Sequence, residues 1–166
     1  MVLRKAAQAP IIPSGMGRKS DQIARAAEPL LAPGEIVEVA AMAVIGKFNV
    51  AKSVALGIAT GLATLGMVSV MTTPKPQPVV LTTKRMLILG FKGIIVEEAD
   101  SKIVTEIPRS ELRARPAKRV ALYYAVDLTD PQGNKMARMK FGFFDGGDAQ
   151  KFAQRLGEPP MVPGQK

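Results

Sequence analysis

The sequence contains no cysteine and no histidine among its 166 residues. Without cysteine the chain forms no disulfide, offers no thiolate to a metal ion and has no thiol nucleophile. Without histidine it has no Ser-His-Asp triad, no imidazole ligand for zinc and no side chain that titrates near neutral pH at its ordinary pKa. We therefore assign no catalytic residue, metal site or cofactor, and we expect a protein that binds or assembles rather than an enzyme.

Aromatic residues are also scarce, with no tryptophan, two tyrosines and six phenylalanines. A buried core must therefore consist mainly of aliphatic side chains and methionine. The length suits one domain with appendages and is too short for two full domains.

Basic residues exceed acidic ones, which gives a net charge of +9 that is unevenly distributed. Residues 1–20 carry four basic residues and no acid, and residues 74–140 carry thirteen basic and seven acidic residues. A basic surface favours anionic lipid, nucleic acid or an acidic protein face. Residues 6–17 are interrupted by Pro10, Pro13 and Gly15 and do not form a secretory signal. We expect a cytoplasmic protein, located at the inner face of the cell membrane if it binds lipid.

The N-terminal half predicts a basic extended tail over 1–19, a short helix over 20–32 and a strand over 35–45. Residues 53–73 follow, with no charge in the whole segment. This segment is long enough to cross a bilayer as a helix. A face of small residues would allow close helix packing, and the packing candidates on it are Gly57, Thr60, Gly61 and Thr64.

The role of 53–73 is open among three alternatives: a complete crossing, shallow membrane insertion, and helix packing inside an assembly. A single crossing would place the strand at 35–45 and the region after residue 79 on opposite sides of the membrane. The two parts could then not share one sheet.

The C-terminal half predicts strands at 79–81, 85–91, 94–96 and 103–107, and a longer strand over 120–128. That strand places Val120, Leu122, Tyr124, Val126 and Leu128 on one face. After a turn at 130–134, the return strand should place Ala137, Met139, Phe141 and Phe143 inward, and Met136, Arg138 and Lys140 outward. A helix from Asp145 to Leu156 presents Ala149, Phe152, Ala153 and Leu156, and a proline-rich tail follows at 158–166.

Five stretches follow one another along the chain: APGEIVEVA at 32–40, VVLTTKRMLIL at 79–89, KIVTEIPRSELR at 102–113, the hairpin 120–144 and DAQKFAQRLG at 148–157. Their order resembles the pleckstrin-homology superfold, and is similar to the short bacterial PH-like and GRAM-like domains. The resemblance implies an α+β fold over 35–157, interrupted at 53–73. The fold would be a curved antiparallel sheet or barrel closed by the C-terminal helix. It also implies a non-enzymatic binding or adaptor module, although a fold does not determine its ligand.

The candidate anion-binding residues lie in and near one basic run. They are Arg109, Arg113, Arg115, Lys118, Arg119, Arg138 and Lys140. Arginine suits the forked geometry of phosphate binding. The alternative is that these side chains simply form a solvated connection between strands.

We therefore predict a module that attaches to an anionic membrane, to a protein partner or to copies of itself as a homo-oligomer. One alternative is a structural subunit of a large protein assembly, with 53–73 buried between neighbours. A second is a nucleic-acid accessory protein. It is the weaker alternative, because single-strand binding platforms interleave several aromatic residues with their basic groove and Tyr123 is the one aromatic near these cations.

Overall fold

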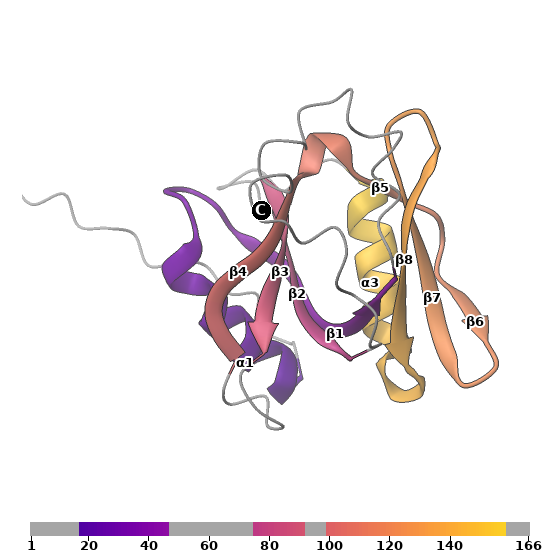
Figure 1. Ribbon diagram of the computed structural model, residues 1–166, viewed down its shortest axis with the longest axis horizontal. Coiled ribbons are helices and arrows are strands. Elements are labelled where there is room, and N and C mark those ends of the chain that lie inside the picture. The colour runs from indigo at the N-terminus through magenta and orange to yellow at the C-terminus, as the bar shows by residue number, and fades with distance from the viewer. Residues whose placement is uncertain (1–16, 47–74, 92–98, 159–166) are drawn as a thin grey trace, which may run out of the picture.

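The computed structural model describes residues 17–46, 75–91 and 99–158 (Figure 1). Its strands form one eight-stranded sheet in the order β4-β3-β2-β1-β8-β7-β5, and β6 also pairs with β7. The described elements are α1 (Arg18–Ala27), η1 (Glu28–Leu30), β1 (Val37–Ile45), β2 (Gln77–Thr82), β3 (Arg85–Phe91), β4 (Ala99–Pro108), η6 (Arg109–Glu111), β5 (Arg113–Ala114), β6 (Lys118–Val120), β7 (Tyr123–Thr129), β8 (Lys135–Gly142), η7 (Phe143–Asp145) and α3 (Gly146–Gly157).

All strand pairings in the described sheet are antiparallel. The predicted short N-terminal helix and C-terminal helix are both confirmed. The sheet is open, because β4 and β5 stand at the two ends of the strand order. The described strands therefore form a curved antiparallel sheet with α3 packed on it, and do not complete a closed barrel.

Two apolar cores lie on opposite faces of the sheet. In β3, Met86 and Ile88 belong to the core beneath α3, whereas Leu87 and Leu89 belong to the core beneath α1. Successive residues of a strand point to opposite faces, so β3 is buried on both sides. This explains why its sequence is an unbroken apolar run rather than an alternating one.

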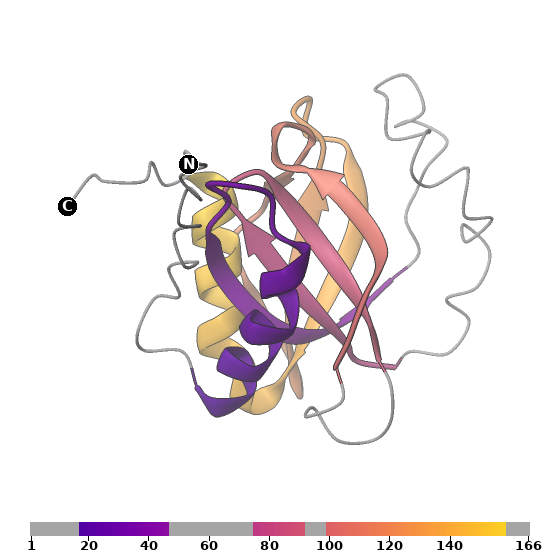
Figure 2. The same cartoon turned by 90° about the vertical axis from the view of Figure 1, so that its left-hand side faces the viewer.

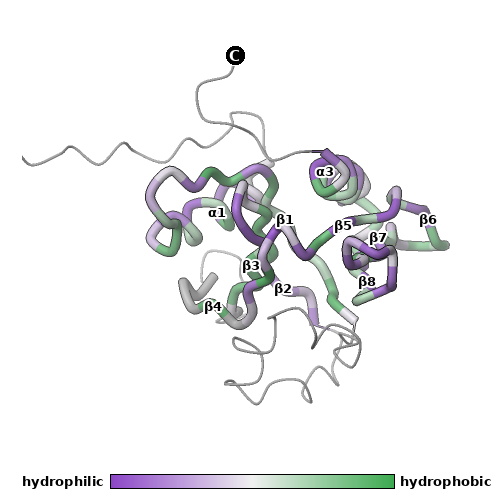
Figure 3. Tube along the Cα trace, turned by 90° about the horizontal axis from the view of Figure 1, so that it is seen from above, coloured by the Kyte–Doolittle hydropathy of each residue, from purple (hydrophilic) through white to green (hydrophobic). Residues whose placement is uncertain are grey.

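The two α-helices of the described residues cover different parts of the sheet. On the outer face α1 contacts β1, β2 and β4, and on the inner face α3 contacts β1, β5, β7 and β8. Figure 2 shows α1 lying across the first strands, and in Figure 3 α1 lies well away from β6, β7 and β8. The outer face of β5–β8 is therefore covered by neither helix.

β1 and β2, the strands on either side of residues 47–74, pair with each other from Val37↔Thr82 to Ala43↔Gln77. Both flanks of the uncharged segment 53–73 thus belong to one sheet, an arrangement that a single complete crossing between them would not allow. The segment itself lies outside the described residues, and so do its packing candidates Gly57, Thr60, Gly61 and Thr64. Within the described ranges, no helix is both long enough and apolar enough to span a membrane.

The prediction of one strand over 120–128 is wrong. The chain forms β6, turns at Ala121 and Leu122, and returns as β7, with Val120 paired to Tyr123. Ala121 has a φ of 49° in this turn, a conformation that non-glycine residues seldom adopt. Val120 and Leu122 are consequently 37% and 79% exposed. No Gly or Asn in the sequence marks the turn, which is why an alternating pattern hid it.

Two predicted orientations in β8 are also wrong. Met136 is buried, because the pairing steps from Leu128↔Ala137 to Thr129↔Lys135 and the resulting bulge turns Met136 towards the core. Phe143 is 44% exposed, because β8 ends at Gly142 and the core alternation stops there. The predicted inward positions of Ala137, Met139 and Phe141 are confirmed.

Candidate anion-binding surface

The outer face of β7 carries the side chains that alternate with its core residues. Tyr124, Val126 and Leu128 pack in the core beneath α3. Tyr123 and Asp127 therefore point to the outer face, which neither helix covers.

Strand register brings cations from three strands onto this outer face. Directly opposed residues of an antiparallel pair share a face. Lys118 of β6 and Lys140 of β8 both oppose Ala125, and Arg138 opposes Asp127. At the far end of β7, Arg113 of β5 and Lys135 of β8 both oppose Thr129.

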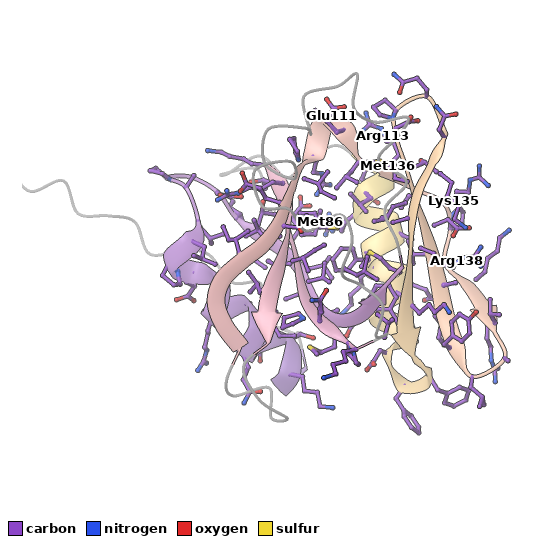
Figure 4. All side chains as sticks on the ribbon, in the orientation of Figure 1. Met86, Glu111, Arg113, Lys135, Met136 and Arg138 are labelled. Atoms are coloured by element: carbon purple, nitrogen blue, oxygen red, sulfur yellow. The ribbon has the colours of Figure 1, made fainter. Side chains whose placement is uncertain are left out.

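Arg115 extends the same group beyond the end of β5. Its backbone N–H donates to the carbonyl oxygen of Asp127 at 2.9 Å, and it lies two residues after Arg113. Intervening Ala114 packs against the core, so Arg113 and Arg115 share the outer side. We define the basic face as Arg113, Arg115, Lys118, Lys135, Arg138 and Lys140. Figure 4 shows Lys135 and Arg138 pointing away from β8, whereas Met86 points into the interior.

Asp127 is the acid at the centre of the basic face. It accepts two hydrogen bonds from Arg138, at 2.6 Å from Nε and 3.0 Å from Nη2, and lies 2.9 Å from Lys135 Nζ. The hydrogen bonds from Arg138, helped by Lys135, hold the pKa of this carboxyl far below its usual range. Asp127 therefore stays ionised and fixes the positions of two cations.

The other four cations of the basic face have no acidic partner within the described part of the chain. Arg113 donates from Nη1 to Leu112 O at 2.7 Å, and Lys140 Nζ lies 5.1 Å from the ring centroid of Tyr123. An ammonium at this distance over an aromatic face is attracted to it. Net positive charge therefore remains on this face, which neither of the described α-helices covers.

Arg109 does not belong to the basic face, contrary to its place among the sequence candidates. It is buried, with its guanidinium donating to Glu38, to Thr82 O and to Arg155 O. Burial of a guanidinium is stable only with such partners. Glu38 lies 71 residues away in the sequence, so no local pattern reveals the pair.

Arg119 also lies apart from the basic face. It opposes Tyr124 rather than Tyr123, and its Cζ lies 5.0 Å from the ring centroid of Phe143.

Five of the seven sequence candidates are thus brought together: Arg113, Arg115, Lys118, Arg138 and Lys140. Lys135 was missed because strict alternation turns it inward, and the bulge at Leu128/Thr129 reverses that direction.

The basic face offers positive charge and hydrogen-bond donors to a ligand. Among the described residues, no group of three or more Asp and Glu side chains is placed to hold a metal ion. Arg and Lys side chains spread over β5, β6 and β8 suit a polyanionic surface better than a single small anion.

No protein-family model matches this chain, and no curated protein matches it. Among solved structures, the activated truncation of Vav1 in its apo form shows 11% identity and a TM-score of 0.47, covering 84% of this chain and 31% of that chain. Autoinhibited Vav1 shows 13% identity and a TM-score of 0.46, covering 84% of this chain and 22% of that chain. A structure concerned with the role of the PH and C1 domains of the Vav1 exchange factor shows 12% identity and a TM-score of 0.42, covering 73% of this chain and 24% of that chain. The present chain thus spans less than a third of each of these structures.

Proposed function

We propose that this chain is a non-enzymatic, pleckstrin-homology-like module that associates with an anionic membrane surface through its basic face. The order of antiparallel strands followed by α3 supports the PH-like part of the proposal. The observation that carries the function is the outer face of β5–β8, where six cations surround one acid and neither helix covers them.

The magnitude of the attraction is sufficient for reversible membrane binding. A Lys or Arg close to an anionic leaflet contributes about 1 kcal/mol, which is about fivefold in affinity. Three cations of the basic face would together change partitioning about 100-fold if all of them lie near the surface. The attraction should weaken with added salt, because exposed charges are screened over about 8–10 Å at physiological ionic strength.

A lipid surface is favoured over nucleic acid by the character of the face. Tyr123 is the one aromatic side chain that the described basic face presents, and its ring lies beneath Lys140. Platforms that bind single strands stack successive bases on several aromatic residues. Nucleic-acid binding is therefore kept as an outcome that the experiment detects.

The test is flotation of the full-length protein with phosphatidylcholine vesicles that contain or lack phosphatidylserine. The triple variant Arg113→Gln/Lys118→Gln/Lys140→Gln should lose most of its binding to the anionic vesicles. The matched control Arg25→Gln/Lys19→Gln/Lys151→Gln removes one Arg and two Lys from exposed positions on α1 and α3, and should retain it.

Three results would overturn the proposal. The first is a protein that stays with the soluble fraction at low salt. The second is equal flotation of both triple variants, since the uncharged segment or bulk charge would then account for binding. The third is a wild-type protein that does not float with vesicles but binds short single- or double-stranded nucleic acid tightly. In that case the triple variant Arg113→Gln/Lys118→Gln/Lys140→Gln would lose the nucleic-acid binding.

A further inference from the structure

The exposed large apolar side chains of the described residues all gather at one end of the molecule. Val120 is 37% exposed, Leu122 79%, Phe143 44% and Phe144 96%. We call these four residues the apolar tip. Scattered exposed apolar residues are ordinary, but a contiguous exposed group marks a contact surface.

Strand pairing explains why the four residues are neighbours. Tyr123 pairs with Val120 on one side and with Gly142 on the other. The β6–β7 turn, which holds Leu122, therefore lies beside the end of β8, where Phe143 and Phe144 follow. The two phenyl rings lie 5.4 Å apart, edge to face. Figure 1 shows the β6–β7 turn and the β8–α3 connection at the same end of the sheet.

The backbone on either side of Phe143 and Phe144 is closely packed at two glycines. A Cβ on Gly146 would lie 2.5 Å from Cε2 of Tyr124, and a Cβ on Gly142 would lie 2.7 Å from Oδ2 of Asp145. At Gly146 the chain after β8 thus runs directly against the partly buried ring of Tyr124.

Cations surround the apolar tip. Arg119 lies over the ring of Phe143, and Lys140 lies over Tyr123, the residue next to Leu122. Lys118 opposes Ala125, two residues beyond Tyr123. Asp145 and Asp148, which follow Phe144 along the chain, are half-buried rather than exposed.

Exposed apolar side chains with cations beside them fit a lipid bilayer better than a folded protein partner. A specific protein interface buries about 1,200–2,000 Å² in total, far more than four side chains at a projecting end supply. An anionic interface needs only shallow insertion of apolar side chains together with cations at the level of the phosphates. Aromatic rings and cationic side chains are favoured at this depth.

We propose that the apolar tip inserts into the headgroup–acyl boundary of an anionic bilayer, with Lys118, Arg119 and Lys140 at the phosphates. This inference rests on the proposed function, and adds to it the depth and the orientation of binding. Thr129, which Arg113 and Lys135 oppose, lies six residues along β7 from Tyr123, or about 20 Å at strand spacing. The molecule therefore binds with the apolar tip towards the bilayer. Arg113, Arg115 and Lys135 then contribute less to the membrane affinity than the cations beside the tip.

A single tryptophan reports insertion, because the natural sequence has none. The variant Phe144→Trp should show a blue-shifted emission with phosphatidylserine-containing vesicles and quenching by lipids brominated on the upper acyl chain. The control reporter Gln132→Trp lies in the exposed β7–β8 turn and should show neither change. Both proteins are full-length.

Two pairs of substitutions test the contacts. Leu122→Ser/Phe144→Ser should weaken vesicle binding about tenfold or more while thermal unfolding stays unchanged, because both side chains are exposed. Lys118→Glu/Lys140→Glu should weaken binding more than Arg113→Glu/Arg115→Glu, which makes the same charge change far from the tip.

The outcomes separate this inference from the proposed function. Flotation of the wild-type protein without lipid quenching of the Phe144→Trp variant, or equal loss of binding in the two charge-reversal pairs, overturns insertion at the tip and leaves the basic face as the binding surface. Absence of flotation with any vesicle overturns the proposed function, and the inference with it.

Discussion

The guanidinium of Arg109 donates to the carboxylate of Glu38 inside the protein, where the two side chains are 7% and 0% exposed. The same guanidinium donates to Thr82 O at 3.1 Å and to Arg155 O near the end of α3. One side chain thus joins β1, β2 and the C-terminal helix. Arg109 is a structural residue, and its charge is not available to a ligand.

Substitution of Arg109 by Ala should lower the free energy of unfolding by about 3–5 kcal/mol, because Glu38 is left buried without this partner. Urea denaturation followed by circular dichroism measures the change. Arg113→Ala, on the basic face, removes the same side chain from an exposed position and should change stability by about 0.5 kcal/mol or less. Equal losses in the two variants would contradict the assignment of Arg109 to the interior.

Substitution of the buried Phe152 in α3 should lower stability far more than substitution of the exposed Phe144 at the apolar tip. Phe152 is 0% exposed, and its ring centroid lies 5.8 Å from that of Phe141. Phe152→Ala should therefore cost about 3–5 kcal/mol, since it removes core contacts and leaves a cavity. Phe144→Ala should change the unfolding free energy by about 0.5 kcal/mol or less. A large loss in the second variant would show that Phe144 is buried in solution.

Gly146 should not tolerate a methyl group, although alanine is the better helix former. Its Cβ would meet Cε2 and Cζ of Tyr124 at 2.5 and 2.6 Å, whereas a Cβ on Gly147 meets nothing within 4 Å. We expect Gly146→Ala to destabilise the protein by about 1–3 kcal/mol, and Gly147→Ala to stabilise it by about 0.5–1 kcal/mol. Thermal unfolding distinguishes the two signs. Adding Tyr124→Ala to Gly146→Ala should remove the steric part of the cost, and a purely additive double variant would exclude the clash.

Asp127 should make stability depend on acidic pH. Hydrogen bonds from Arg138 and the nearby Lys135 lower the pKa of Asp127 in the folded protein. The contribution of Asp127 to the free energy of unfolding is therefore present above the unfolded pKa of about 3.9. That contribution is lost as the pH falls through the folded value. Asp127→Asn should cost about 1 kcal/mol at pH 7, and the difference from wild type should shrink in strong acid. Urea midpoints at neutral and acidic pH measure it. Glu111→Gln, whose carboxylate forms no ion pair among the described residues, is the charge-matched control and should change stability at pH 7 by about 0.5 kcal/mol or less.

The local elements follow from the order of residues along the chain. The apolar run of β3, the stripe of Ala149, Phe152, Ala153 and Leu156 on α3, and the core positions Ala137, Met139 and Phe141 are all set by residue spacing. Local backbone geometry fixes which neighbours share a face, so spacing is enough to predict them. The absence of Cys and His likewise limits the chemistry of the site, because it depends on composition alone.

Contacts between distant parts of the chain, in contrast, set which cations lie together and which apolar residues are exposed. Arg109 is adjacent to the basic run in sequence but buried, because Glu38 meets it from another strand. Lys135 joins the basic face, and Met136 the core, through a bulge in the pairing of β7 with β8. Leu122 is exposed because the chain reverses at Ala121 without a glycine. Each of these depends on strand register and on contacts between residues distant in sequence, which side-chain periodicity along one strand does not encode.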